Sequence, residues 1–115
     1  MSEYITLKEN RDFSRLYKRG KSFVSPVLVT YVMKNKSGVT RYGITTGKKV
    51  GKAVSRTRAR RVIRAAYYEL YPQLKSGYDL VFVARTRTAQ IKSYDVGRAM
   101  KKHLGQAGIL NHSEL

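Results

Sequence analysis

Cationic side chains gather between residues 48 and 64, which read KKVGKAVSRTRARRVIR. Five of these residues are arginines, and the next carboxylate is Glu69. Guanidinium groups bind phosphate oxygens through paired hydrogen bonds. Arg56, Arg60 and Arg64 are four residues apart, and like charges at that helical spacing repel by about 0.2–0.5 kcal/mol per pair. The segment is therefore suited to an external polyanion, whereas a merely solvated face usually mixes both signs of charge.

Residue types that would support catalysis by the protein itself are sparse. The chain has no cysteine, which excludes thiolate catalysis and cysteine-ligated metal sites. His103 and His112 lie near or in the C-terminal tail and are expected at the surface. A two-metal nuclease needs several carboxylates that converge. A fold could still bring Asp79 and Asp95 together, but nothing in the sequence requires it. The seven carboxylates are scattered: Glu3, Glu9, Asp12, Glu69, Asp79, Asp95 and Glu114.

The overall charge indicates the class of partner. The chain has 115 residues, which predicts a single domain over residues 1–115, and its formal net charge is +17. Such an excess attracts polyanions, so nucleic acid is the leading partner and an anionic membrane the second. The membrane is the weaker alternative, because the basic segment has no bulky apolar face before Tyr67. Neither a secretory signal nor a membrane-length apolar run is visible, which predicts a cytoplasmic protein.

Aromatic residues beside cations form a second group with possible chemistry. Phe13 and Tyr17 are four residues apart in a segment rich in arginine and lysine, and Tyr31 lies in an extended segment. Such rings can stack on unpaired bases. They can equally belong to the core, where Leu16 is expected to pack.

The elements that must position these residues follow from periodicity and from breaker residues. Helices are predicted from Asn10 to Gly20, from 51 to 71 and from Ser93 to Gly105. Residues 22–33 and 39–46 are predicted to form an antiparallel hairpin, with a bend or sheet edge at Pro26. Residues 78–85 are predicted to form a central strand, and residues 109–115 a frayed tail. One face of the second helix is apolar and expected in the core: Ala59, Val62, Ile63, Ala66 and Leu70.

This order of elements predicts a small α+β two-layer sandwich with a mostly antiparallel sheet. The run RYGITTGKKVGKAVSRTRARRVIR at residues 41–64 resembles the signature of the bacterial ribonuclease P protein family. The resemblance extends over nearly the whole chain and includes further pieces in the same order and spacing. These are Asn10-Arg11-Asp12-Phe13, Arg19-Gly20, the strand around Tyr31, Gly77-Tyr78-Asp79 and Ala84-Arg85.

The resemblance implies an αβββαβα fold with a left-handed βαβ crossover. It also implies a protein subunit that binds a catalytic RNA and the 5′ leader of precursor tRNA. In that family the RNA, acting with Mg²⁺, hydrolyses the precursor, and no protein side chain is catalytic. The free protein is expected to be a monomer that joins the RNA as one copy. The alternative is a structural, ribosomal-type RNA-binding protein with no role in cleavage.

Positions can be carried over from the family motif. Residues implied to bind the catalytic RNA are Lys48, Lys49, Lys52, Arg56, Thr57, Arg58, Arg60, Arg61 and Arg64. Residues implied to bind the leader are Phe13, Tyr17, Tyr31 and Arg85. Three positions depart from the family pattern. Asn is usual at the positions of Thr57 and Lys52, and Ser or Ala is usual at the position of Gly47. A threonine hydroxyl reaches less far than an amide, which puts any amide-specific contact at Thr57 in doubt. No metal ligand is assigned on the protein.

Overall fold

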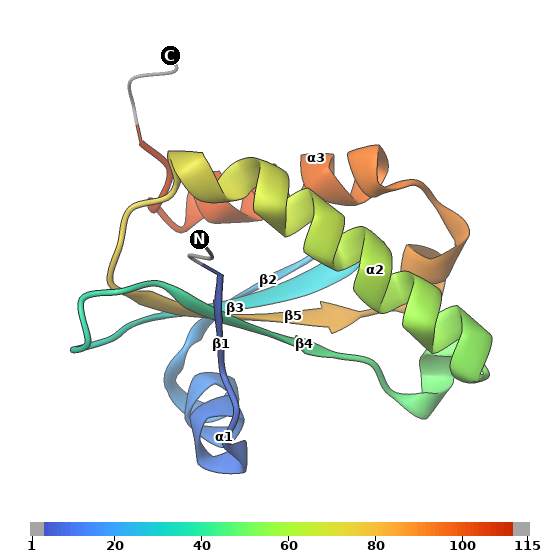
Figure 1. Cartoon of the computed structure of the whole chain (residues 1–115), viewed down its shortest axis with the longest axis horizontal. Coiled ribbons are helices and arrows are strands. Elements are labelled where there is room, and N and C mark those ends of the chain that lie inside the picture. Colours follow the sequence, from blue (N-terminus) through green and yellow to red (C-terminus); the bar gives the residue numbers. More distant parts are fainter. Residues whose placement is uncertain (1–3, 112–115) are drawn as a thin grey trace.

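The computed structural model describes residues 4–111, so Glu3, His112 and Glu114 lie outside the described residues. A five-stranded sheet carries helices on both of its faces (Figure 1). The described helices are α1 (Asn10–Arg19), α2 (Ala53–Leu70) and α3 (Ser93–Gln106). The strands are β1 (Ile5–Thr6), β2 (Lys21–Val24), β3 (Leu28–Lys34), β4 (Arg41–Thr45) and β5 (Tyr78–Ala84). Short 3-10 helices are η1 (Lys48–Val50), η2 (Tyr71–Gln73) and η3 (Thr86–Gln90).

The strand order is β1-β4-β5-β3-β2, with β5 at the centre. The predicted central strand is confirmed, but the predicted pairing of residues 22–33 with 39–46 is wrong, because β5 lies between β3 and β4. The hairpin is instead formed by β2 and β3, which turn at Pro26. Two pairings are parallel and two are antiparallel, so the sheet is mixed rather than mostly antiparallel.

The connection between β4 and β5 determines the handedness of the fold. In Figure 1 the chain follows β4 from left to right, returns above the sheet through α2, and enters β5 behind β4. This path is a left-handed crossover, the hand that parallel strands rarely adopt. The helix and strand order matches the expected αβββαβα, with the short β1 added before α1.

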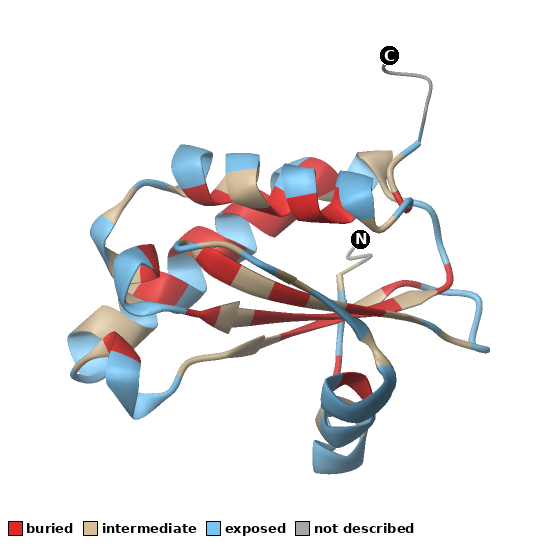
Figure 2. Ribbon diagram, turned by 180° about the vertical axis from the view of Figure 1, so that it is seen from behind, coloured by how far each residue is buried: buried red, intermediate tan, exposed pale blue. Residues whose placement is uncertain are grey.

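The sheet separates two unequal cores, so the molecule has three layers where two were expected. The larger core lies between the sheet and the α2–α3 layer and includes Tyr67, Phe82 and Met100. The smaller core lies under α1 and is formed by Leu7, Leu16 and Val81. The buried part of α1 accordingly faces the sheet, while its outer side is exposed (Figure 2). The separate layer is not evident from the sequence, because α1 contributes only Leu16 as a fully buried residue.

Residues 109–111 are more ordered than predicted, and the rest of the predicted tail, residues 112–115, lies outside the described residues. Ile109 is fully buried, and Leu110 forms an isolated β-bridge with Leu74, so the tail does not fray at residue 109. His103 is buried rather than at the surface, with its Nδ1 atom 2.9 Å from the hydroxyl of Thr30. Burial lowers the pKa of His103, because desolvation disfavours the charged imidazolium. The imidazole is therefore part of the core, where its neutral form is favoured.

Candidate nucleic-acid interface

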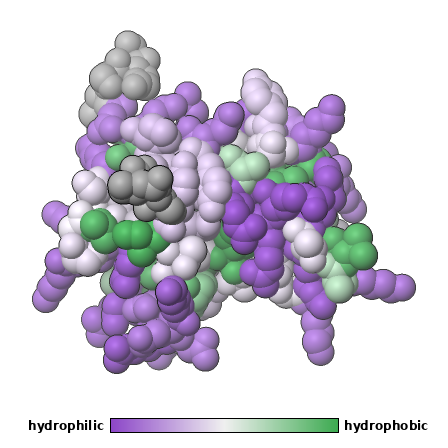
Figure 3. All heavy atoms as spheres, viewed as in Figure 1, coloured by the Kyte–Doolittle hydropathy of each residue, from purple (hydrophilic) through white to green (hydrophobic). Residues whose placement is uncertain are grey.

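The orientation of α2 exposes most of the basic segment. The apolar side chains predicted to lie in the core are buried against the sheet and α3. Arg60, Arg61 and Arg64 consequently project to solvent, and Lys48 and Lys49 are exposed on η1. Figure 3 shows hydrophilic side chains gathered along α2 on the side of the molecule seen in Figure 1. We call the exposed set the basic surface: Lys48, Lys49, Lys52, Thr57, Arg60, Arg61 and Arg64.

Two predicted RNA-binding arginines have partners within the protein. The Arg58 guanidinium donates hydrogen bonds to the carbonyls of Ala89 (2.9 Å) and Ile91 (3.1 Å), and so ties α2 to the segment around η3. The Arg56 guanidinium donates to the carbonyl of Gly51 (3.2 Å). Both side chains are half-buried, unlike the other arginines of the segment. This division cannot be predicted from the sequence, because all five arginines lie within nine residues and carry the same charge.

The turn before α2 brings the lysines of η1 to the start of the helix. Gly51 separates η1 from α2 and has φ 135°, a conformation in which a residue with a side chain would be strained. Lys52 follows at the N-cap position in extended conformation. The first turn of α2 contains no acidic residue, so its free amides and the nearby lysines present positive charge together. This arrangement favours an anion at the start of α2.

The basic surface is not neutralised from within the protein. Among residues 4–111 the ion pairs are Arg11–Glu9, Arg15–Asp12 and Arg41–Asp79, none of which involves the basic surface. The mutual repulsion of its cations therefore remains uncompensated in the free protein. No helix in the same described part is long and apolar enough to cross a membrane.

The three predicted aromatic residues come together where α1 packs on the sheet. The Phe13 ring lies over Gly43, where an added Cβ would stand 2.6 Å from a ring carbon. The Tyr17 and Tyr31 rings meet edge to face with their centroids 5.0 Å apart. The Tyr17 hydroxyl lies 2.8 Å from the hydroxyl of Thr45. Phe13 is half-buried in the smaller core, whereas the Tyr17 side chain is 42% exposed, so Tyr17 is the more accessible ring.

The sheet beside these rings is only partly covered. On the face that carries α1, strand register places Gly43, Val81 and Tyr31 in one row. The next row consists of Thr45, Val83 and Val29, which are half-buried, and it continues to the exposed Val24 on β2. We call the rings and this row the aromatic surface: Phe13, Tyr17, Tyr31, Thr45, Val83 and Val29. Periodicity alone could not identify the row, because strand register decides which side chains are neighbours.

Strand β4 joins the two surfaces. Thr45 contacts Tyr17 of the aromatic surface, while the Arg60 guanidinium points to the carbonyl of the preceding residue, Ile44 (3.5 Å). Arg85 follows the end of β5, is exposed, and donates to the carbonyl of Ser25 (3.1 Å). It therefore lies beyond the Val83 end of the aromatic surface. A single strand of nucleic acid could therefore contact both surfaces along β4.

The described carboxylates do not converge. Asp79 is 1% exposed and accepts two hydrogen bonds from Arg41, from Nε at 2.9 Å and from Nη2 at 2.7 Å. These contacts raise the pKa of the Arg41 guanidinium. Asn35 donates a third hydrogen bond to Asp79 (2.8 Å). Asp95 lies on α3, on the opposite face of the sheet, so the pairing of Asp79 with Asp95 that a nuclease would need is not formed. Asp79 is a structural residue.

Comparisons with known proteins agree with this geometry. The model of the Ribonuclease P family matches residues 1–108. The "Ribonuclease P protein component" of Clostridioides difficile (strain 630) is 45% identical over 96 residues, covering 83% of this chain and 84% of that protein. That of Clostridium botulinum (strain Loch Maree / Type A3) is 40% identical over 106 residues, covering 91% of this chain and 96% of that protein.

Solved structures show the same fold. The Staphylococcus aureus RNase P protein superposes with a TM-score of 0.80 at 29% identity, covering 92% of this chain and 97% of that chain. The Thermotoga maritima protein gives a TM-score of 0.77 at 26% identity, covering 88% and 96%. A family match over nearly the whole chain, close relatives and a shared fold lead to one conclusion. The chain belongs to the family of bacterial ribonuclease P protein components, the RNA-binding subunits of a tRNA-processing ribonucleoprotein.

Proposed function

We propose that the protein binds the catalytic RNA of ribonuclease P through the basic surface and the 5′ leader of precursor tRNA on the aromatic surface. The observation that carries the proposal is their meeting at β4, where Thr45 contacts Tyr17 and the neighbouring carbonyl faces Arg60. A single-stranded leader of a precursor tRNA held by the catalytic RNA can therefore pass directly onto the accessible ring of Tyr17. Before assembly the protein is a monomer in the cytoplasm, and one copy joins each RNA.

The proposed mechanism is electrostatic and geometric. The RNA, with Mg²⁺, hydrolyses the leader junction, and no protein side chain takes part in that step. Cations of the basic surface offset repulsion between phosphates, which lowers the Mg²⁺ concentration that the assembled complex needs. Tyr17 and Tyr31 add contacts to unpaired leader bases, which mature tRNA lacks. The complex therefore prefers the precursor to the product.

Cleavage of precursor tRNA at low Mg²⁺, with and without ribonuclease P RNA, tests the proposal. Cleavage at the leader junction is expected only when both RNA and protein are present. Tight RNA binding without stimulated cleavage would instead favour the structural RNA-binding alternative. That alternative also predicts equal affinity of the assembled complex for precursor and mature tRNA, because it gives the aromatic surface no ligand.

Tyr17→Ala is expected to weaken precursor binding by the assembled complex by ~1–3 kcal/mol, the range for loss of one base–aromatic stack. Affinity for the catalytic RNA alone should stay unchanged, because Tyr17 lies outside the basic surface. Binding of precursor and mature tRNA to complexes made with each protein measures the effect. Tyr17→Phe keeps the ring but not the hydroxyl bonded to Thr45, and should retain most of the affinity. Equal losses for precursor and mature tRNA would contradict a role in leader binding.

A further inference from the structure

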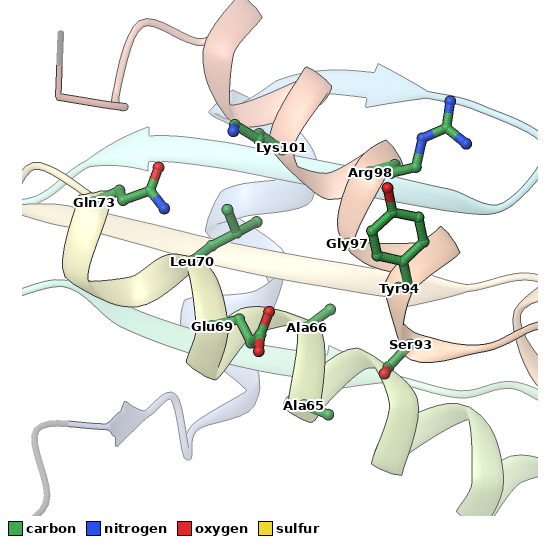
Figure 4. Close-up of a pocket in the computed structure, with 10 residues that line it drawn as sticks. All are labelled: Ala65, Ala66, Glu69, Leu70, Gln73, Ser93, Tyr94, Gly97, Arg98 and Lys101. Carbon is green, nitrogen blue, oxygen red and sulfur yellow. The ribbon is translucent and has the colours of Figure 1, made fainter. Parts of the chain in front are cut away.

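A groove between α2 and α3 has the shape and chemistry of a nucleotide site. Its volume is about 530 Å³, within the range of small-molecule sites. Ala65 and Ala66 of α2 and Gly97 of α3 line it with small side chains, which leave room for a flat ring. Figure 4 shows Ala65, Ala66 and Glu69 along α2, with Tyr94, Arg98 and Lys101 along α3. The groove lies on the opposite face of the sheet from α1 and the aromatic surface.

Tyr94 gives the groove an accessible aromatic ring. Its side chain is 74% exposed, more than the 42% exposed Tyr17. Arg98 and Lys101 follow Tyr94 by four and seven residues, so all three lie on one stripe of α3. Both cations are exposed, and neither forms an ion pair with a carboxylate of the described chain. An aromatic ring and two cations on one stripe are the groups that would contact the base and the phosphates of a nucleotide.

The groove continues the basic surface. Arg61, Ala65 and Glu69 are four residues apart along α2, so they form one row on the helix. Arg61 belongs to the basic surface, while Ala65 and Glu69 line the groove. RNA bound along the exposed arginines therefore reaches the groove one helical turn later. Charge complementarity favours RNA over a second copy of this chain, because two copies carry +17 each.

We propose that this groove holds one unpaired nucleotide of RNA. The base stacks on Tyr94 over the small side chains, Arg98 and Lys101 bind the flanking phosphates, and the Glu69 carboxylate accepts a hydrogen bond from an exocyclic amine. Unpaired bases are commonly recognised in this way, by stacking and by hydrogen bonds to their edges. The proposal rests on the proposed RNA-binding function. The nucleotide belongs either to the catalytic RNA or to the tRNA substrate.

Tyr94→Ala and Tyr94→Phe distinguish these sources. Tyr17→Ala serves as the reference variant, because it is expected to lose affinity for precursor tRNA but not for the catalytic RNA alone. In the first arm each protein is titrated against ribonuclease P RNA alone. In the second arm each assembled complex is titrated against precursor and mature tRNA. Tyr94→Ala is expected to weaken binding about 5- to 150-fold in one arm, the loss of one stacked base. Tyr94→Phe should bind like the original protein. A loss in the first arm assigns the nucleotide to the catalytic RNA, and a loss confined to the second arm assigns it to the tRNA.

Photo-crosslinking from 4-thiouridine in the affected RNA should label the peptide that contains Tyr94. Thermal unfolding tests whether each variant is folded. We expect both Tyr94 variants to fold, because Tyr94 is exposed. Unchanged affinity in both arms, or self-association that Tyr94→Ala abolishes, would overturn the proposal. Arg60→Ala tests the proposed function separately. If Arg60→Ala leaves RNA affinity unchanged, the proposal that the basic surface binds RNA is wrong. If Arg60→Ala lowers RNA affinity but Tyr94→Ala does not, only the proposal for the groove is rejected.

Discussion

Replacing Arg60, Arg61 and Arg64 together with alanine is expected to weaken binding of ribonuclease P RNA by about 100-fold at ~0.15 M salt. The three guanidinium groups are exposed and have no carboxylate partner within the described chain. Each phosphate contact releases counterions from the RNA, so losing three contacts lowers the slope of log affinity against log salt by about three. Removing cations that repel one another should not destabilise the free protein.

Titrations at several salt concentrations measure both quantities. The matched control replaces Lys34, Lys36 and Lys75 with alanine, which removes the same net charge from exposed positions outside both surfaces. This control should lose much less affinity, because its lysines contribute only to the overall field. If both triple variants lose affinity equally, binding depends on net charge rather than on the basic surface.

Asp79→Ala is expected to lower the free energy of unfolding by about 3 kcal/mol. The substitution removes the acceptor of two hydrogen bonds from Arg41 and one from Asn35. Breaking a buried ion pair is costly because the remaining charge keeps its desolvation penalty. Arg41 is only partly exposed, with 27% of its side chain accessible, so water can replace its lost partner only in part.

Chemical denaturation of the original protein and the variant measures this loss. Asp95→Ala is the matched control, since that carboxylate is exposed on α3 and should change stability little. Combining Asp79→Ala with Arg41→Ala should recover part of the lost stability by removing the unpaired charge. If Asp79→Ala folds with unchanged stability but alters RNA cleavage, Asp79 acts in the reaction and its structural role is wrong.

The helices and the central strand could be predicted from the sequence because their signals are local. The apolar stripe of α2 and the Pro and Gly residues that follow it define that helix over eighteen residues. The position of β5 between β3 and β4 could not be predicted, because nothing in residues 22–46 shows that a strand beginning at Tyr78 will separate them. Pairing of neighbouring strands is the usual outcome, and this fold departs from it.

The functional surfaces show the same division between local and long-range information. Charge density alone identified the basic segment, and the family resemblance placed Phe13, Tyr17 and Tyr31 together. The internal hydrogen bonds of Arg58 depend on carbonyls more than thirty residues away, so no local pattern reveals them. The stripe of Tyr94, Arg98 and Lys101 is visible in the sequence, but its function depends on the facing helix.

The central position of β5 has a consequence for protein synthesis. Strands β3 and β4 leave the ribosome before β5, and neither can pair with the other in the native sheet. Contacts that span large sequence separations form late and slow folding. The nascent chain therefore carries the cationic segment well before Phe82 is available to complete the core beneath α2. A truncated product that ends before residue 78 has the charge that attracts RNA but not the sheet that orients it. The native orientation of the basic surface therefore requires that β5 has been synthesised.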